Sequence, residues 1–314
     1  MRITGVSARP LVHVFTIETL TFTIARPPAR PYFARTMNAL LTAAILAAAP
    51  LKVTPIVGTP QGFFVTSTLV TGEREAVLID AAFTLADAHR VAAAVLDSGK
   101  TLTTVYVTHA HPDHYFGLTA LKAAFPNAKF VAKPDTIAEI NKTSKPKLDQ
   151  WKPMYGANLT DAPVVPEPLT GDTITLEGEK LQITGGVQGD DGHNSFVWIP
   201  SIKAVIGGDT LYNGVHVWTA ETKAPTRKAW LATLDKLEKL KPEIVVAGHK
   251  TPDAKDDVSA ISFTRDYLKA FDAAVTGSKT AAEVQEKLKA KYPNAALDII
   301  AKLGSEAQFA AASK

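Results

Sequence analysis

The sequence predicts a single α/β (α+β) domain that contains two β-sheets. Segments patterned like β-strands recur in pairs along the chain, and segments patterned like helices separate these pairs. The composition agrees with a folded globular domain, since 46% of the 314 residues are apolar and 21% are charged. The pattern becomes regular after Pro55 and continues without an internal repeat.

The first half of this domain is predicted to begin with a hairpin that turns at Gly72, because its two strands are rich in β-branched and aromatic residues. A helix follows, with Thr84 as the expected N-cap and Gly99 as the expected stop. The expected elements, in order, are strands over 63–70 and 75–80, a helix over 85–96, a strand over 102–107, a helix that ends at 124 and a strand over 129–132.

The segment over 133–168 is rich in Lys and Pro and is weakly patterned. We expect a helix followed by a loop around Trp151 and Tyr155, and this insert is a candidate lid or pocket wall. The remaining expected elements are strands over 173–176, 180–183, 196–199 and 204–207, a helix over 228–240, a last strand over 243–246, and helices from 258 onward that are broken at Gly277, Pro293 and Gly304.

Residues 1–50 differ from the rest and are predicted to form a leader. Arg26, Arg30 and Arg35 precede a short apolar run over 37–49 that ends in small residues. A basic flank, an apolar stretch too short to span a bilayer and an Ala-x-Ala end are typical of a secretory signal peptide. Cleavage is expected near Ala49, which predicts a periplasmic or secreted protein with no stable membrane anchor. If the run is instead an Ala-rich helix of the domain, the protein is expected to be cytoplasmic.

Cysteine is absent, which excludes disulfides, thiolate nucleophiles and cysteine-ligated zinc. Any metal must therefore be bound by nitrogen and oxygen atoms. The formal net charge of +3 is small, and Lys and Arg are dispersed, so no nucleic-acid partner is expected. The expected partner is a small-molecule substrate, and the oligomeric state stays open.

The candidate site begins after the strand expected over 102–107, in the stretch Thr108-His-Ala-His-Pro-Asp-His114. His109 and His111 are two positions apart in an extended segment, so both rings can point to the same side. Asp113 and His114 lie at the start of the following helix. Burying this many ionisable groups in one turn is costly unless something holds them together, and a metal ion is the simplest candidate.

Three further polar residues lie beside predicted strands, each next to a glycine. His193 precedes the strand at 196, Asp209 ends the strand that begins at 204, and His249 follows the last strand. Any one of them alone is typical of a turn, as we expect for Asp190 and Asp191 in a solvated loop. Together the three supply the imidazole and carboxylate ligands that a two-metal site needs. The neighbouring glycines leave room for the ligands to converge.

Four motifs, Thr108–His114, Gly192-His193, Gly208-Asp209-Thr210 and Gly248-His249, resemble the successive motifs of the metallo-β-lactamase superfamily over roughly residues 54–275. The resemblance implies a four-layer αββα sandwich over 51–278, with two divalent metal ions in a cleft at one edge of the sheets, followed by a helical extension over 279–314. The implied ligands are His109, His111 and His193 for the first metal, Asp113, His114 and His249 for the second, Asp209 as the bridge between them, and Asp80 behind them as an orienting partner.

Asp209 indicates which branch of the superfamily the sequence resembles, because true zinc β-lactamases generally have Cys or Ser at this position. The sequence looks more like the branch of glyoxalase-II-type thioesterases and lactonases. The implied function is hydrolysis of an ester, lactone, thioester or related acyl bond by a hydroxide activated between two metal ions, with Zn²⁺ expected first and Fe or Mn as alternatives. Asp113 is expected to orient the hydroxide and then pass a proton to the leaving group.

Other functions stay open beside acyl hydrolysis. The same ligands could hold iron for redox chemistry, as in persulfide dioxygenases, since imidazole and carboxylate do not choose between zinc and iron. Phosphodiester and β-lactam hydrolysis use the same core. A non-catalytic binding module is disfavoured because degenerate members usually lose ligands. Candidates for the pocket wall are Tyr115, Tyr212 (also a candidate donor to an oxyanion), His216 and Trp218, and the helical tail could cap the cleft or form a dimer contact.

Overall fold

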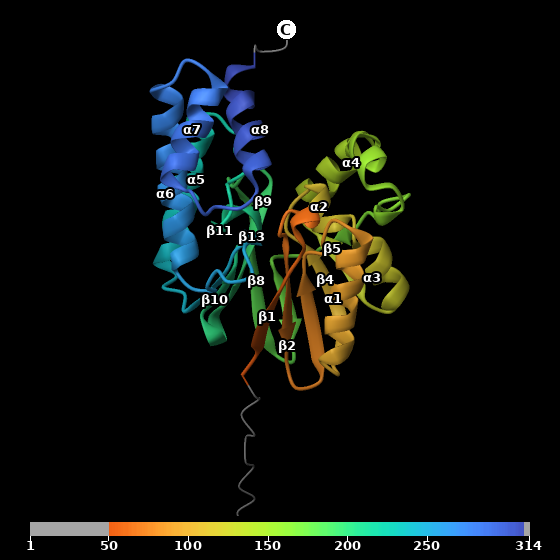
Figure 1. Cartoon of the computed structure of the whole chain (residues 1–314). Helices are drawn as coiled ribbons and strands as arrows, with labels where there is room; N and C mark the ends of the chain where they lie inside the picture. The colour runs from red at the N-terminus through yellow and green to blue at the C-terminus, as the bar shows by residue number, and fades with distance from the viewer. Residues whose placement is uncertain (1–49, 311–314) are drawn as a thin grey trace, which may run out of the picture. The chain divides into compact units, whose positions relative to one another are not determined.

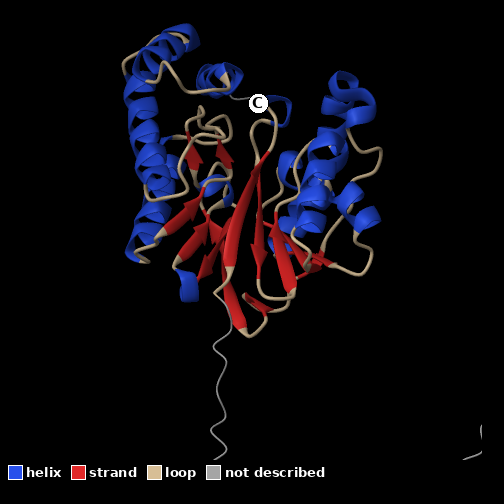
Figure 2. Cartoon of the chain, turned by 60° about the horizontal axis from the view of Figure 1, so that its bottom comes forward, coloured by secondary structure: helices blue, strands red, loops and turns tan. Residues whose placement is uncertain are grey.

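The computed structural model describes residues 50–310, so the leader predicted over 1–50 lies outside the described residues except for Pro50. The described part is layered: two β-sheets lie face to face, and helices cover the outer face of each sheet (Figures 1 and 2). This is the αββα sandwich that the family resemblance implies, and its two sheets each mix parallel and antiparallel strands.

The first sheet has six strands in the order β1-β2-β3-β4-β5-β6. The predicted hairpin is β2 and β3, which pair antiparallel with Leu69 opposite Leu78. From β3 onward the strands run parallel, with Ile79 opposite Tyr106. The strands are β1 (Lys52–Val57), β2 (Thr66–Thr71), β3 (Glu75–Ile79), β4 (Thr101–Val107), β5 (Lys129–Ala132) and β6 (Glu167–Pro168).

The second sheet has five strands in the order β12-β10-β9-β8-β7, and a separate two-stranded ladder joins β11 to β13. β12 runs parallel to β10, whereas β7 to β10 are antiparallel neighbours. These strands are β7 (Thr173–Leu176), β8 (Glu179–Val187), β9 (Asn194–Ile199), β10 (Ala204–Ile206), β11 (Tyr212–Asn213), β12 (Ile244–Val246) and β13 (His249–Lys250). β12 was expected as the last strand, but β13 follows it.

Helices α1 to α4 accompany the first sheet, and α5 to α8 accompany the second (Figure 1). The predicted cap of α1 is confirmed, because Thr84 accepts a hydrogen bond from the backbone N–H of Asp87 and the chain turns at Gly99 with φ +67°. The α-helices are α1 (Leu85–Asp97), α2 (Pro112–Tyr115), α3 (Leu118–Ala124), α4 (Pro134–Tyr155), α5 (Ala224–Lys239), α6 (Ser259–Thr276), α7 (Ala281–Lys291) and α8 (Asp298–Phe309). Short 3₁₀ turns lie at η1 (Pro60–Gly62), η2 (Gly156–Asn158), η3 (Pro200–Ile202) and η4 (Gly208–Thr210).

Alternation along the central strands explains the layering. On β3, Ala76 and Leu78 point to the core under α1, while Val77 and Ile79 point to the core between the sheets. A strand whose successive side chains are apolar on both faces must be covered on both faces. The third core, beneath α5 and α6, also takes in Leu288 of α7 and Ala301 of α8. The C-terminal helices therefore pack as part of the same compact unit as the strands.

Two segments differ from the sequence-based expectations. Trp151 and Tyr155 lie within α4, which runs through Pro146 and Pro153 to Tyr155, and not in a loop. Gly304 lies inside α8 and does not end it. A Cβ atom at Gly304 would lie 2.3 Å from Thr219 Oγ1, so this glycine allows a close approach between α8 and the chain before α5.

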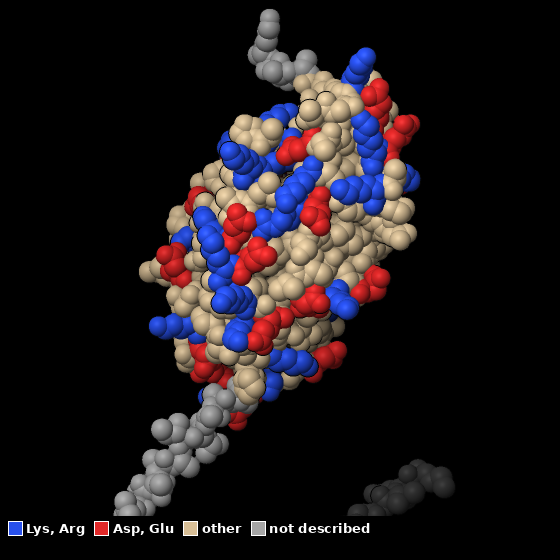
Figure 3. Space-filling view, turned by 90° about the vertical axis from the view of Figure 1, so that its left-hand side faces the viewer, with Lys and Arg blue, Asp and Glu red and all other residues tan. Residues whose placement is uncertain are grey.

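Basic and acidic side chains alternate over the face shown in Figure 3, so no patch of a single sign forms on that face. Within residues 50–310, none of the helices combines the length and apolar character needed to cross a membrane.

Candidate metal centre

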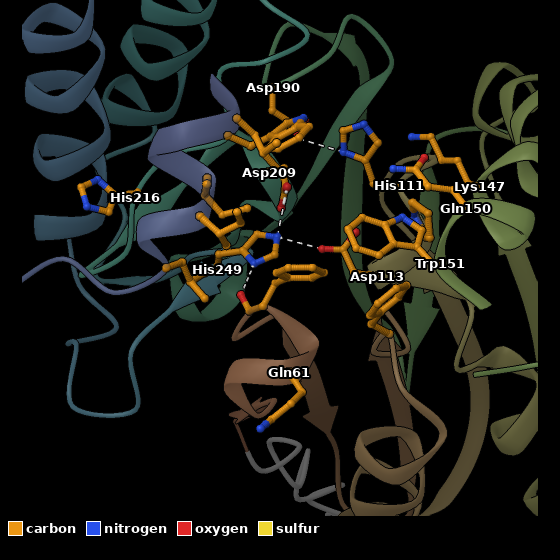
Figure 4. A pocket seen from close by; sticks show the side chains of 18 of the residues that line it. Gln61, His111, Asp113, Lys147, Gln150, Trp151, Asp190, Asp209, His216 and His249 are labelled. Carbon is orange, nitrogen blue, oxygen red and sulfur yellow. Dashed lines mark hydrogen bonds and ion pairs between the residues drawn. The ribbon is translucent and has the colours of Figure 1, made fainter. Parts of the chain in front are cut away.

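The candidate site lies where β4, β10 and β12 end, and each of these strands delivers a polar residue into a common cleft (Figure 4). The cleft has a volume of about 620 Å³, within the usual range for a small-molecule site. Its lining includes the polar residues His111, Asp113, Asp190, Asp209 and His249.

The histidine-rich motif follows β4 directly. His109 is fully buried, and His111 has an extended backbone (φ −79°, ψ 139°) immediately before α2. Pro112 begins α2, where its missing N–H costs nothing, and the first turn then presents Asp113 and His114. The local sequence thus explains both why the helix starts here and why four ligand-type side chains share one turn.

Asp80, at the end of β3, supports this motif from behind. Its Oδ1 accepts a hydrogen bond from the backbone N–H of Thr108 at 2.8 Å, and its Oδ2 accepts one from Thr108 Oγ1 at 2.9 Å. The Nδ1 atom of His114 lies 2.8 Å from the same Oδ2. The orienting position expected for Asp80 is therefore the one it occupies, behind the imidazole and outside the cleft.

Hydrogen bonds also assign the ring nitrogens of three histidines. Since Thr108 Oγ1 gives its proton to Asp80, it accepts from Nδ1–H of His109, 3.0 Å away. His249 Nδ1 donates to the carbonyl of Phe63 at 2.6 Å, and His114 Nδ1 donates to Asp80. In the neutral form of each ring this leaves Nε2 without a proton, and that is the form that binds a metal.

Asp209, expected as the bridge, lies in the turn η4 after β10 and is close to histidines of both groups. Its Oδ1 lies 3.0 Å from His114 Nε2, and its Oδ2 lies 3.2 Å from His249 Nε2 and 3.7 Å from His109 Nε2. Gly248 makes this convergence possible, because a Cβ atom there would lie 2.4 Å from Asp209 Oδ1. The room that the glycines were expected to leave is therefore used by the ligands themselves.

Two groups of side chains could each hold a metal ion, with the ligand atoms of each group within 4.8 Å of one another. Six of the seven ligands expected from the sequence belong to these groups. The first group is His109, His111, Asp190 and Asp209, and the second is Asp113, His114 and His249.

His193 is the expected ligand that the structure does not bring to the site. Its side chain is exposed, and the loop folds so that Asp190 lies inside in its place. Asp190 Oδ2 lies 2.9 Å from His111 Nδ1 (Figure 4). Asn194 causes this inversion, because its Nδ2 donates to both Asp190 and Asp191 at 2.8 Å and closes the loop with Gly192 and His193 outward. The expectation that Asp190 is a solvated loop residue is wrong, since it is fully buried.

The electrostatics of the cluster favour a bound cation. Burial, followed by the nearby His114, lowers the pKa of His109 well below its ordinary value, so this imidazole is neutral and ready to bind. Burial raises the pKa of Asp190 to about 7, and the neighbouring Asp209 adds to the rise against the opposing effect of His111. A buried carboxylate held among other carboxylates is a group that a metal ion would stabilise in its charged form.

Unpaired buried atoms indicate where that cation would bind. Among the described residues, His109 Nε2 and Asp209 Oδ1 are buried without a hydrogen-bond partner. Such atoms are costly to leave unpaired, and both point into the cluster. The donor set of imidazole nitrogens and carboxylate oxygens fits two divalent ions of the zinc, iron or manganese type.

The pocket residues expected from the sequence divide into two groups. Tyr212, His216 and Trp218 line the cleft, whereas Tyr115 packs in the core against Phe116 and is absent from the lining. Tyr212 stacks on the His249 ring, and its hydroxyl donates to Asp209 Oδ2 at 2.7 Å, so it is committed to a ligand and not free for an oxyanion.

His216 faces away from the metal ligands. Its Nδ1 lies 2.9 Å from the hydroxyl of Tyr267, on α6. It contributes a wall of the cleft and no ligand.

Sequence comparison now supplies the family. The model of the metallo-beta-lactamase superfamily matches residues 60–249, more than half of the chain, and the chain belongs to this superfamily. The matched region contains every residue of the two ligand groups.

Solved structures agree with the fold. A metallo-beta-lactamase from Pontibacter korlensis is 20% identical over 71% of this chain and 96% of its own, with a TM-score of 0.53. A metallo-beta-lactamase family protein from Thermus thermophilus is 21% identical over 82% of this chain and 91% of its own, with a TM-score of 0.58. At these identities the likeness shows the fold and does not select a branch of the superfamily. Comparison with curated proteins gave no match.

Proposed function

We propose that this protein is a metal-dependent hydrolase that cleaves an ester, lactone, thioester or related acyl bond. The observation that carries the proposal is the convergence of two buried ligand groups on Asp209 at the floor of an open cleft. A pair of divalent ions held there would supply a hydroxide at neutral pH and would polarise a carbonyl oxygen.

Asp113 is the residue of this chain that we assign to proton handling. It lines the cleft, and its Oδ2 lies 3.2 Å from His249 Nε2. Burial opposes its ionisation, but the neighbouring His114 and His249 outweigh burial and hold the pKa of Asp113 well below its ordinary value. A carboxylate at this place can accept a proton from the attacking water and release it to the leaving group.

Other residues around the cluster hold the ligand side chains in position. Asp80 and the Phe63 carbonyl fix the rings of His114 and His249, and Tyr212 holds Asp209. Asp80 and Tyr212 are buried, so they hold these ligands in a defined orientation.

A panel of substrates tests the hydrolase. Protein loaded with Zn²⁺ is offered chromogenic esters, lactones, a thioester, nitrocefin and bis-nitrophenyl phosphate. We expect turnover of acyl substrates and loss of both turnover and metal content in Asp209→Ala. His89→Ala, which alters an exposed histidine on α1, is the matched control and should keep both. Metal-loaded protein that turns over no acyl substrate would overturn the proposal.

The three aspartates of the ligand groups favour one alternative function, an iron-dependent oxidoreductase. With Asp190 in place of an imidazole, three aspartates accompany four histidines, and oxygen ligands suit iron and manganese as well as zinc. An iron-dependent oxidoreductase of the same fold is therefore the second candidate. Metal analysis of protein purified without added metal, together with an oxygen-consumption assay, separates the two.

A further inference from the structure

The cleft above the metal centre has two apolar walls that come from opposite parts of the chain. On α4, Trp151, Met154 and Tyr155 occupy positions i, i+3 and i+4 and so share one face of the helix. On α8, Ile299 and Leu303 are likewise four positions apart. Figure 1 shows α4 and α8 at the same end of the two sheets, on opposite sides.

The rims of both walls expose large apolar side chains to solvent. Met154 is 64% exposed and Ile299 is 47% exposed, and they belong to a set of only six large apolar residues left exposed in the described part of the chain. Exposed apolar groups that border a pocket are typical of a ligand-binding surface.

An aromatic cluster makes the inner end of the α4 wall rigid. Trp151 packs edge-on against Phe63 at 5.5 Å and against Phe83 at 5.7 Å, and Tyr155 packs against Phe83 at 4.9 Å. Both phenylalanines line the cleft beside the metal ligands. The apolar surface is therefore preformed and continuous with the site of reaction.

Beyond the metal centre, the cleft offers a single cationic side chain to an anionic group of a substrate. Among the described residues that line the cleft, Lys147 is the one Lys or Arg, and its Nζ lies 3.9 Å from Glu221 Oε1. The polar residues beyond the ligands include the uncharged amides of Gln61, Gln150 and Asn158. A carboxylate or phosphate on the substrate would compete with Glu221 for Lys147, whereas an uncharged chain would not.

We propose that the substrate carries an uncharged, extended apolar acyl chain, which lies between the α4 and α8 walls while its carbonyl reaches the metal centre. This inference rests on the proposed hydrolase function and names its substrate class. Each methylene buried between the walls adds favourable transfer free energy, which corresponds to about a three- to fourfold gain in kcat/KM where the chain is fully covered.

The first test is a series of nitrophenyl esters from acetyl to decanoyl, assayed with the metal-loaded full chain. We expect kcat/KM to rise by about three- to fourfold per methylene until the cleft is filled. In the double variant Met154→Ser/Ile299→Ser, the ratio of kcat/KM for octanoyl to acetyl ester should fall by about tenfold or more. A ratio that is flat in the native protein overturns the acyl-chain proposal and leaves the hydrolase proposal standing.

The control is Leu96→Ser/Val258→Ser, which removes two apolar side chains of similar exposure, 66% and 52%, away from the cleft. This variant should keep the native octanoyl-to-acetyl ratio. If it loses the ratio as fully as the cleft variant does, the preference does not come from these walls and the proposal fails.

A binding measurement separates the two proposals if no ester is turned over. The uncharged, unreactive ketone 2-decanone is titrated calorimetrically into the native protein, the cleft variant and the control. Binding that is lost in the cleft variant alone supports the acyl chain even where the hydrolase proposal has failed. Absence of binding to the native protein overturns the acyl-chain proposal.

Discussion

Asp80 links two parts of the site through one carboxylate. It receives two hydrogen bonds from Thr108, which fixes the end of β4, and it faces Nδ1 of His114. Its own backbone has φ +62°, an unfavourable conformation for a residue other than glycine. A carboxylate behind a ligating histidine fixes the ring orientation and raises the basicity of the other nitrogen.

Asp80→Asn should therefore weaken metal binding while the fold persists. The amide keeps the shape but removes the charge, and we expect a loss of about 10- to 100-fold in metal affinity. Competition with a chromogenic chelator measures this affinity, and circular dichroism checks the fold. Asp97→Asn, at the exposed end of α1, is the control. Equal affinities in native protein and Asp80→Asn would contradict the orienting role.

The loop before β9 marks the limit of motif-based prediction at this scale. His109, His111, Asp113 and His114 were predictable, because an extended segment followed by a helix start has a regular geometry. The segment 188–193 has no period, so spacing does not tell which polar side chain points inward. The signal that was available is Asn194, whose amide can hold the loop closed around Asp190.

Asp190→Ala and His193→Ala form a matched pair that tests whether Asp190, and not His193, belongs to the metal site. We expect Asp190→Ala to lose metal from the first ligand group, because one of its four side chains is gone, and His193→Ala to keep the native metal content. Inductively coupled plasma mass spectrometry after dialysis counts the ions per chain. The reverse result would restore His193 as the ligand.

At the scale of elements, α4 shows why strand and helix patterns predict less near an active site. Pro146 and Pro153 indicate loop in the sequence, since proline lacks the N–H that a helix interior uses. The helix persists because Trp151 and Tyr155 pack on Phe63 and Phe83, contacts that join distant parts of the chain. Tertiary packing of this kind outweighs local propensity and leaves no local signature.

The turns of the two sheets are tied together by Glu177, in the turn between β7 and β8. Its carboxylate accepts hydrogen bonds from the backbone N–H groups of Glu73, Arg74 and Glu75, at 2.8, 2.5 and 2.7 Å. Gly72 allows this approach, since a Cβ atom there would lie 2.7 Å from Glu177 Oε2. The hairpin glycine expected from the sequence thus also serves a contact between sheets.

A pH-dependent contribution to stability follows from Glu177. The backbone N–H of Arg74, followed by that of Glu73, lowers the pKa of the Glu177 carboxyl in the folded state. A lowered pKa stabilises the fold above the ordinary value of 4.5, and this contribution is lost as pH falls toward the folded-state pKa.

Glu177→Gln should lower the melting temperature near pH 7, and the difference from native protein should shrink as the pH falls below 4.5. Thermal unfolding followed by circular dichroism over this range measures both. Glu179→Gln, two residues along, makes none of these bonds and is the control. A difference that is constant with pH would show that the charge of Glu177 does not matter.

At the scale of the whole molecule, strand and helix patterns predict the layers of the fold but not which distant residues meet at the site. The strand pairs separated by helices predicted two sheets, and the apolar residues on both faces of β3 explain why the sheets are covered on both sides. Nothing in a periodic pattern places His249 against Asp113, which lies far from it in the chain. That contact depends on the order of strands in each sheet, and only the resemblance to a family placed the two residues in one ligand group.

The predicted leader bears on where the whole chain is located. We propose that residues 1–49 direct export and are removed near Ala49, because a basic flank and a short apolar run precede small residues there. Intact mass of the protein recovered from an exporting host should show a chain that begins close to Leu51. Replacing Leu40 and Leu41 by Arg should abolish both export and cleavage. A full-length chain that stays in the cytoplasm would contradict the proposal.

Metal removal should destabilise the entire sandwich, because the ligands come from both sheets. His109 and His111 follow β4 of the first sheet, whereas Asp209 and His249 follow β10 and β12 of the second. Ions that bind only the folded state add about 2.7 kcal/mol of stability at a free concentration 100 times the dissociation constant. A chelator should then lower the melting temperature by about 5–10 °C, and added Zn²⁺ should restore it. Asp209→Ala is the internal control, since a chain that has lost its bridge should melt at the same temperature with and without the chelator. An unchanged melting temperature of the native protein would mean that the cluster holds its shape without cations, and the metal centre would be refuted.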